Sequence, residues 1–136
     1  MFEQLLNNVR ELNLPKGKYA LCGSAPIVVK GIREATHDID IIVTTDVWEE
    51  YDGKEGWVKK PSNASEYLER EGKNIELWRD WAPGEWNVEK LIKDAEIIDG
   101  LPYVQLDDIL KWKKLHGRPK DLEDVRLIEE YLSKSR

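Results

Sequence analysis

The sequence contains one cysteine, two histidines and no long apolar run. The single thiol, Cys22, excludes an internal disulfide framework and a cysteine-cluster zinc site, and neither histidine has a partner at metal-ligand spacing. No apolar stretch approaches the length that spanning a membrane requires. Positive charge is not in excess either, and the net charge of −6 argues against broad nucleic-acid binding. This charge still allows contact with a nucleotide or with one RNA end.

The remaining composition is that of an ordinary globular protein with many charged residues. The 136 residues are 40% hydrophobic and 35% charged, which predicts a single domain over residues 1–136 with a real core. Residues 2–12 mix apolar, acidic and basic side chains, and this pattern indicates an amphipathic helix rather than a signal peptide. We therefore expect cytoplasmic residence.

Two carboxylates interrupt an apolar run that is typical of a buried strand. Because strand side chains alternate between faces, Asp38 and Asp40 point the same way, with Cα atoms roughly 6.5–7 Å apart. Ile39, Ile41 and Val43 then fall on the opposite face and anchor the strand in the core. Carboxylates at this spacing suit hard divalent cations such as Mg²⁺, which prefer oxygen ligands. The plain alternative is that Asp38 only opens the strand and Asp40 caps a loop, since so short a motif is often coincidental.

Strand and helix signals alternate along the chain, with two hairpin turns at 71–73 and 99–100. This order predicts an α+β fold with a mixed or antiparallel sheet of about four to six strands, covered by helices and ending in two helices. In the last helix, Leu122, Val125, Ile128 and Leu132 have the spacing of a buried side. We expect strands at 19–22, 38–43, 57–58, 67–68, 74–78, 96–98 and 103–104, and helices at 2–12, 25–30, 45–51, 85–95, 107–116 and 118–132.

Six tryptophans are a high number for this length, and three of them lie within nine residues. Trp78, Trp81 and Trp86 are expected to fill the core or an interface between two copies of the chain. A stacking platform for a nucleobase is the alternative function of such a cluster.

Two blocks of the sequence resemble the nucleotidyltransferase superfamily, whose fold is shared with DNA polymerase beta. The signature of that superfamily is a strand, Gly-Ser, a spacer and Asp-hydrophobic-Asp, which match Gly23-Ser24 and Asp38-Ile39-Asp40. The run from Gly31 to Asp38 is similar to the Gly-x-Arg-x-Thr-x-Asp segment of small prokaryotic members, which are toxin-type or antibiotic-nucleotidylating proteins. The C-terminal block also matches these members, at Asp108, Ile109, Leu110, Lys113, Gly117, Arg118, Lys120, Asp121 and Asp124.

The resemblance implies a metal site with three carboxylates. Asp38 and Asp40 would hold Mg²⁺ or Mn²⁺, and a third acid on a later strand would complete the set and accept a proton. Glu76 is the best candidate because it lies between hydrophobic residues on an expected strand. Asp80 is the alternative, and Glu76 as an exposed residue on an edge strand is the plain interpretation.

The resemblance also implies a site for the triphosphate of a nucleoside triphosphate (NTP) donor. Gly23 has no Cβ and allows the backbone to approach phosphate, and Ser24 offers its hydroxyl and N–H at a helix start. Ser24 is equally suited to be a helix N-cap. Lys113 and Arg118 are the basic residues expected to face the triphosphate, whereas Asp121 and Asp124 are expected to pair with Arg118, Lys120 or Arg126.

The implied function is metal-dependent transfer of a nucleoside monophosphate from an NTP to a hydroxyl acceptor. The acceptor is a small molecule, such as an aminoglycoside, or a tRNA end, and its site is expected to need a homodimer or a partner chain. The alternative is a non-catalytic nucleotide- or protein-binding module of the same fold, such as one half of a toxin–antitoxin-like pair. A weaker alternative is a generic α/β binding domain in which Asp38-Ile39-Asp40 is coincidental.

Overall fold

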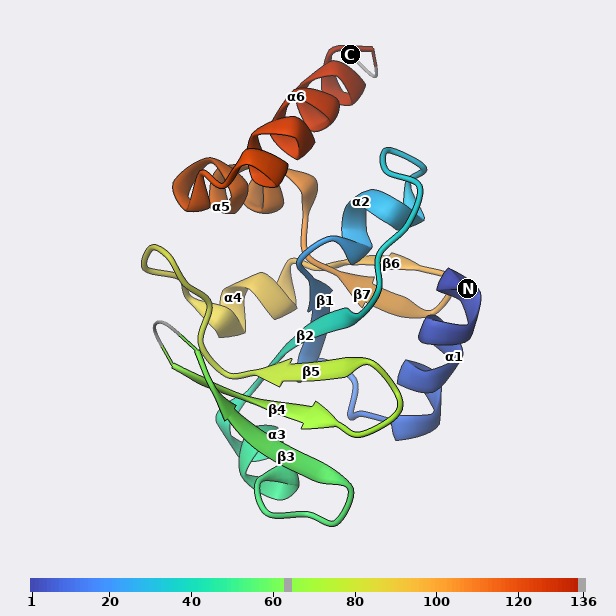
Figure 1. Cartoon of the computed structure of the whole chain (residues 1–136), viewed down its shortest axis with the longest axis vertical. Helices are drawn as coiled ribbons and strands as arrows, with labels where there is room; N and C mark the ends of the chain where they lie inside the picture. The colour runs from blue at the N-terminus through green and yellow to red at the C-terminus, as the bar shows by residue number, and fades with distance from the viewer. Residues whose placement is uncertain (63–64, 135–136) are drawn as a thin grey trace.

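The computed structural model of the chain describes residues 1–62 and 65–134, which form a mixed sheet with helices on both faces (Figure 1). The strand order is β3-β4-β5-β2-β1-β7-β6. β2 pairs with β5 and β1 with β7 in parallel, and the other neighbours are antiparallel. The strands are β1 (Tyr19–Cys22), β2 (Ile39–Val43), β3 (Trp57–Pro61), β4 (Glu66–Arg70), β5 (Ile75–Trp78), β6 (Glu96–Ile98) and β7 (Leu101–Tyr103).

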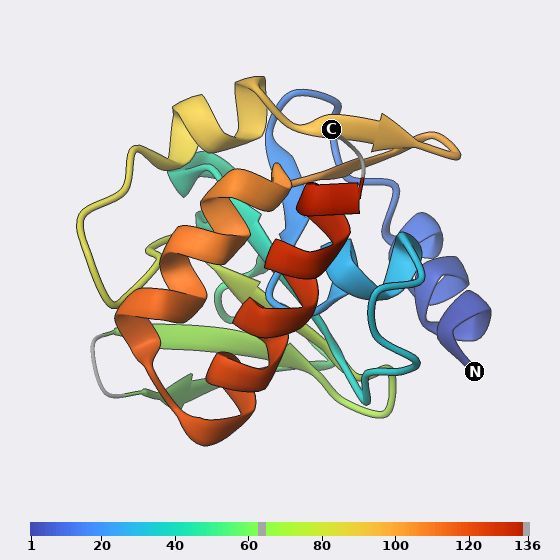
Figure 2. The same cartoon turned by 90° about the horizontal axis from the view of Figure 1, so that it is seen from above.

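Six helices cover the described part of the sheet. Figure 2 shows α5 and α6 side by side above the strands, with the turn between them at one end. α5 ends at Gly117, which has a φ of +64° and provides the left-handed residue that terminates many helices. The helices are α1 (Phe2–Leu12), α2 (Ala25–Val29), α3 (Thr45–Tyr51), α4 (Val88–Lys93), α5 (Leu106–His116) and α6 (Pro119–Lys134).

The two faces of the sheet carry separate hydrophobic cores. β2 contributes Ile39, Ile41 and Val43 to the core beneath α1 and α3, and Ile42 to the core shared with α4, α5 and α6. The alternation predicted for this strand is therefore confirmed. Asp40, which neighbours Ile39 and Ile41 in sequence, lies on the same face as Ile42. The acidic side of β2 thus faces the C-terminal helices.

The predicted α+β class is confirmed, and the sheet is larger than expected, with seven strands among the described residues. β2 begins at Ile39, so Asp38 precedes the strand rather than lying within it. The helix expected at 85–95 is shorter, because Asn87 accepts a hydrogen bond from the Lys90 N–H at 3.0 Å and starts α4 at Val88. Leu122 is 56% exposed and does not belong to the buried side of α6.

No helix within residues 1–62 and 65–134 combines the length and the apolar character that crossing a bilayer demands.

Candidate functional site

The register of the central strands brings acidic side chains together across the sheet. Asp40 of β2 is the direct partner of Glu76 on the parallel strand β5, and of Cys22 on β1. Glu76 is in turn the partner of Glu69 on β4. Directly opposed residues in a sheet project from the same face. These four residues, Cys22, Asp40, Glu76 and Glu69, therefore form a row across the face that α5 and α6 cover. Because three of the four are carboxylic acids, we call it the acidic row.

Asp40 and Glu76 are half-buried, and the pKa of each carboxyl is raised above its ordinary value. Burial raises the pKa of the Asp40 carboxyl well above its ordinary value, and the charges of Glu76 and Asp38 raise it further. Burial and the charge of Asp38 also raise the pKa of Glu76, against a hydrogen bond shared with Asp40. Two carboxylates in this position are stabilised by a positive charge between them.

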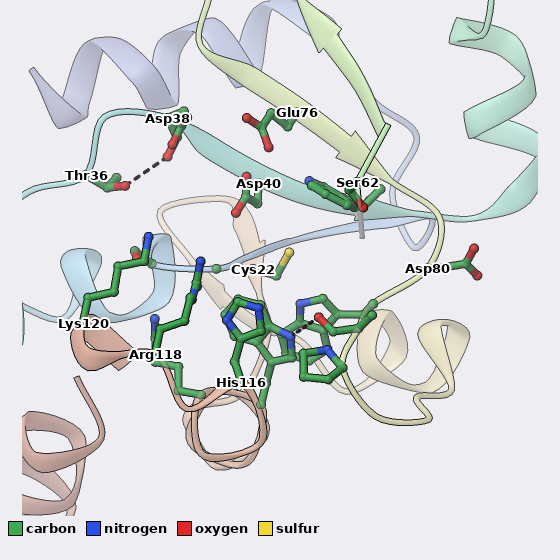
Figure 3. A pocket seen from close by; sticks show the side chains of 18 of the residues that line it. Cys22, Thr36, Asp38, Asp40, Ser62, Glu76, Asp80, His116, Arg118 and Lys120 are labelled. Atoms are coloured by element: carbon green, nitrogen blue, oxygen red, sulfur yellow. Dashed lines mark hydrogen bonds between the residues drawn. The ribbon is translucent and has the colours of Figure 1, made fainter. Parts of the chain in front are cut away.

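Asp38 lies at the rim of this row. Its side chain is exposed, and its backbone carbonyl accepts a hydrogen bond of 3.2 Å from the Thr36 hydroxyl (Figure 3). Within residues 1–62 and 65–134, no three His, Cys, Asp or Glu side chains converge closely enough to form a complete metal centre. The site thus contains Asp40 and Glu76 side by side on neighbouring strands, with Asp38, which was expected to share the first metal-binding pair with Asp40, next to them.

Gly23 is required at its position by the Asp40 carboxylate itself. Its φ is +63°, and a Cβ built there would lie 2.5 Å from Oδ2 of Asp40. Real Cβ atoms do not approach an oxygen so closely, so any side chain at 23 would displace the carboxylate. The sequence indicated Gly23 as a place for phosphate to approach, and the structure adds this contact with Asp40.

Ser24 occupies the N-cap position of α2, as one alternative predicted, but its side chain makes no capping hydrogen bond. The hydroxyl instead accepts a hydrogen bond of 3.1 Å from an NH1 group of Arg33. The helix that follows has only five residues, so its dipole contributes little. Ser24 is therefore tied to Arg33, a residue that the sequence motif contained but to which we assigned no role.

An open cavity of about 790 Å³ lies between the acidic row and the C-terminal helices. The candidate site residues predicted from the sequence all line it, and the wall opposite the carboxylates is basic. Asp80 also reaches the cavity but is exposed, lies beyond the end of β5 and bonds to the Ser65 hydroxyl at 3.2 Å. Figure 3 shows Asp80 away from the pair, so Glu76 is the carboxylate next to Asp40. The lining includes Gly23, Ser24, Arg33, Asp38, Asp40, Glu76, Lys113, His116, Arg118 and Lys120.

Lys113 is buried rather than free. It is 2% exposed, and its Nζ lies 3.0 Å from Asp124 Oδ2 and 3.7 Å from Asp121 Oδ1. Arg118 donates to Asp121 through Nε at 2.6 Å and remains 42% exposed at its side chain. The expected pairing of Asp121 with Arg118 is confirmed. Asp124 differs from the expectation, because it pairs with Lys113 and Arg33. Arg126, one of the alternative partners, binds Glu123 and Glu130 on the outer side of α6.

Three of the six tryptophans pack together beside the cavity. Trp81 packs on Trp86 and Trp112 with ring centroids 4.6 and 5.1 Å apart, and Trp112 stacks on His116 at 5.3 Å. Trp81 is 7% exposed and belongs to the second core, as the core interpretation predicted. Trp78 lies apart from this stack and packs against Tyr67 at 4.6 Å. Sequence spacing linked Trp81 with Trp78, but only the fold reveals Trp112 as its neighbour, with His116 stacked on Trp112.

Lys113, Asp121 and Asp124 form a buried ionic cluster that is expected to stabilise the fold. A substitution of Asp121 tests this expectation. Burial raises the pKa of Asp121, but hydrogen bonds from Arg118 and His116 outweigh it and lower this pKa from 3.8 to about 2. A carboxyl with a lowered pKa stabilises the fold above pH 3.8 and loses that effect as the pH falls towards 2. We expect Asp121→Asn to lower the free energy of unfolding at pH 7 by about 2 kcal/mol, and by much less at pH 2.5.

Denaturant unfolding at both pH values measures the difference. Glu123→Gln, on the exposed side of the same helix, is the control. An equal loss of stability at the two pH values would contradict the ionic role of Asp121.

Comparison by structure finds similar proteins, although no protein-family model and no curated protein matches the sequence. The solution structure of the antibiotic-resistance factor ANT(2'')-Ia, a nucleotidyltransferase, has a TM-score of 0.59 and 18% identity, over 96% of this chain and 82% of that one. The crystal structure of ANT(2'')-Ia in complex with adenylyl-2''-tobramycin has a TM-score of 0.54 and 19% identity, over 96% and 87% of the two chains. The chain therefore has the nucleotidyltransferase fold that its Gly-Ser and Asp-Ile-Asp motifs indicated.

Proposed function

We propose that the protein transfers a nucleoside monophosphate from an NTP to a hydroxyl group of an acceptor, with a divalent cation held by Asp38, Asp40 and Glu76. The observation that carries this proposal is the pairing of Asp40 with Glu76 on neighbouring parallel strands, facing the cavity. The likeness to nucleotidyltransferases supports the same chemistry at the level of the fold.

The donor atoms fit a hard cation such as Mg²⁺ or Mn²⁺. They are carboxylate oxygens, and burial raises the pKa of both Asp40 and Glu76, so an added positive charge would favour their ionised forms. Asp38 stands within electrostatic reach of both. When bound, the cation supplies positive charge that stabilises the attacking and departing oxygens of a phosphoryl group.

The protein residues supply position and a proton acceptor. Glu76 Oε atoms face the cavity at half burial, where the carboxylate takes the proton of the acceptor hydroxyl. Because Gly23 has no side chain, the backbone beside Asp40 leaves room for the donor phosphate. Ser24 lines the same part of the cavity and offers its hydroxyl. Arg118 and Lys120 line the opposite wall and favour the negative charge of the triphosphate.

The acceptor is a second substrate that carries the reacting hydroxyl. The complex of ANT(2'')-Ia with adenylyl-2''-tobramycin makes tobramycin the first small molecule to test, and a tRNA end is the other class to include. A second copy of the chain or a partner chain is proposed to complete the acceptor site.

Labelled NTPs incubated with Mg²⁺, tobramycin and tRNA test this function through the transfer of label. We expect Glu76→Gln to reduce transfer by roughly 100-fold, because the neutral amide neither accepts the proton nor binds a cation well. Glu49→Gln is the matched control, since Glu49 is exposed on α3, away from the cavity. Asp80→Asn is expected to retain most of the transfer, because Asp80 lies off the acidic row.

Two results would speak against this assignment. Equal transfer by the wild type and Glu76→Gln would remove Glu76 from the chemistry. Binding of NTP without transfer to any acceptor would favour the alternative, a non-catalytic nucleotide-binding module.

A further inference from the structure

A buried carboxylate connects three distant parts of the chain behind the cavity. Asp124 on α6 is 5% exposed at its side chain and accepts from Arg33 NH1 at 3.2 Å. The same Oδ2 atom lies 3.0 Å from Lys113 Nζ on α5. Arg33 follows α2, and its NH1 also donates to the Ser24 hydroxyl. Asp124 therefore fixes the position of Arg33 relative to Ser24.

Asp121, one turn earlier on α6, does the same for Arg118. Its side chain is fully buried, and it accepts from Nε of Arg118 at 2.6 Å, from NH2 at 3.2 Å and from the backbone N–H of Arg118 at 3.2 Å. His116 Nδ1 lies 2.9 Å from the same carboxylate. Lys113 sits between Asp121 and Asp124 and is 3% exposed at its side chain.

The exposures of the charged groups divide the cluster into two parts. Lys113, Asp121 and Asp124 are buried, whereas the side chains of Arg33 and Arg118 are 36% and 42% exposed and line the cavity. A guanidinium has five N–H donors, so each arginine keeps donors beyond those used on its carboxylate. Three cations share two carboxylates, which leaves the cluster positively charged and opposite Asp40 and Glu76.

We propose that Arg33 and Arg118 form a clamp for the polyphosphate chain of an NTP, that Asp124 and Asp121 are its positioning residues, and that Lys113 is the buried counter-ion that holds both carboxylates. This inference rests on the proposed function and makes it more specific. It assigns Lys113 a role behind the clamp instead of direct contact with phosphate. Arginine suits the clamp because one planar guanidinium binds a carboxylate on one edge and phosphate on another.

Calorimetric titration with inorganic tripolyphosphate, and in parallel with ATP and Mg²⁺, tests the clamp without reference to transfer. We expect Arg33→Gln and Arg118→Gln each to weaken the binding of both ligands by about tenfold or more, the range of a lost charge-assisted hydrogen bond. Arg126→Gln is the matched control, because Arg126 lies on α6 and does not line the cavity. Loss of binding in Arg126→Gln equal to that in the clamp variants would reduce the effect to net charge and overturn the proposal.

The positioning role of Asp124 and a purely long-range charge effect predict opposite changes in the affinity for tripolyphosphate. Asp124→Asn removes a negative charge near the cavity, so long-range attraction alone would strengthen tripolyphosphate binding. If Asp124 positions Arg33, binding weakens instead, by roughly threefold to tenfold. Arg33→Lys, which leaves the buried cluster intact, is expected to bind almost as weakly as Arg33→Gln, since one ammonium cannot replace the guanidinium geometry.

The outcomes also separate the clamp from the proposed function. Unchanged or tighter binding in Asp124→Asn, together with full binding in Arg33→Lys, would overturn the clamp while leaving nucleotidyl transfer untouched. Failure of the wild-type protein to bind ATP or tripolyphosphate would instead remove both. Thermal unfolding of each variant shows whether the fold is retained, and Arg33→Lys decides the matter if Asp124→Asn does not fold.

Discussion

Asp40→Asn is expected to reduce nucleotidyl transfer by roughly a thousandfold while making the folded protein more stable. Transfer falls because an amide replaces the carboxylate at the centre of the acidic row, next to Glu76. Stability rises because like charges directly opposed on neighbouring strands are unfavourable, and the neutral amide removes one of them. The expected gain is about 1 kcal/mol in the free energy of unfolding at pH 7 without divalent cations.

The direction of this effect follows from the raised pKa of Asp40. A carboxyl whose pKa is higher in the folded state than in the unfolded state destabilises the fold as the pH rises above the pKa of the unfolded state. At pH 7 this loss of stability is present. Asn has no charge to desolvate, so the penalty disappears.

Thermal unfolding with and without Mg²⁺ or Mn²⁺ measures both parts of the prediction. In the wild type, a cation bound between the carboxylates is expected to raise the unfolding temperature, because a ligand that binds only the folded state stabilises it. In Asp40→Asn the cation is expected to have little effect. A wild-type protein insensitive to both cations at millimolar concentration would contradict the metal site, whatever the transfer assay shows.

Gly23→Ala is expected to be as damaging to transfer as the loss of Asp40, and unlike Asp40→Asn it should also destabilise the fold. The new Cβ would lie 2.5 Å from Asp40 Oδ2, so the carboxylate must turn away from its position. The positive φ adds strain of roughly 1–2 kcal/mol for a residue with a side chain.

Gly31→Ala provides a matched control for this substitution. Gly31 has a φ of +73°, close to the +63° of Gly23, but a Cβ there meets no atom within 4 Å. Both variants therefore carry the backbone strain, and only Gly23→Ala moves the Asp40 carboxylate. Similar losses of transfer in the two variants, measured alongside their unfolding temperatures, would show that strain alone is responsible.

The part of the site that depends on local pattern could be predicted from the sequence. The alternation of Ile39, Ile41 and Val43 against Asp40 is set by the two-residue period of a strand, and the structure has it as expected. The hairpin turn at 71–73 and the end of α5 at Gly117 are also local signals that were correct. The register between β2 and β5 was beyond such reasoning, because it pairs residues 36 positions apart in the chain.

The basic wall was harder to predict because charged side chains are normally solvated. Lys113 was expected to meet a ligand, yet it is buried against Asp121 and Asp124. Its burial depends on two carboxylates brought by another helix, and helical spacing within α5 does not reveal them. Arg33 was overlooked for the same reason, since its partner Asp124 lies 91 residues away.

The cross-strand pairing of Asp40 with Glu76 makes the site sensitive to the length of the chain as well as to its residues. β5 presents Glu76 to the cavity, whereas Ile75 and Leu77 on either side of it enter the opposite core. An insertion or deletion that slips β5 by one residue would exchange the two faces. Glu76 would then point into the apolar core, and Ile75 or Leu77 would stand opposite Asp40. We therefore expect that related chains differ in β5 by substitutions far more often than by insertions or deletions.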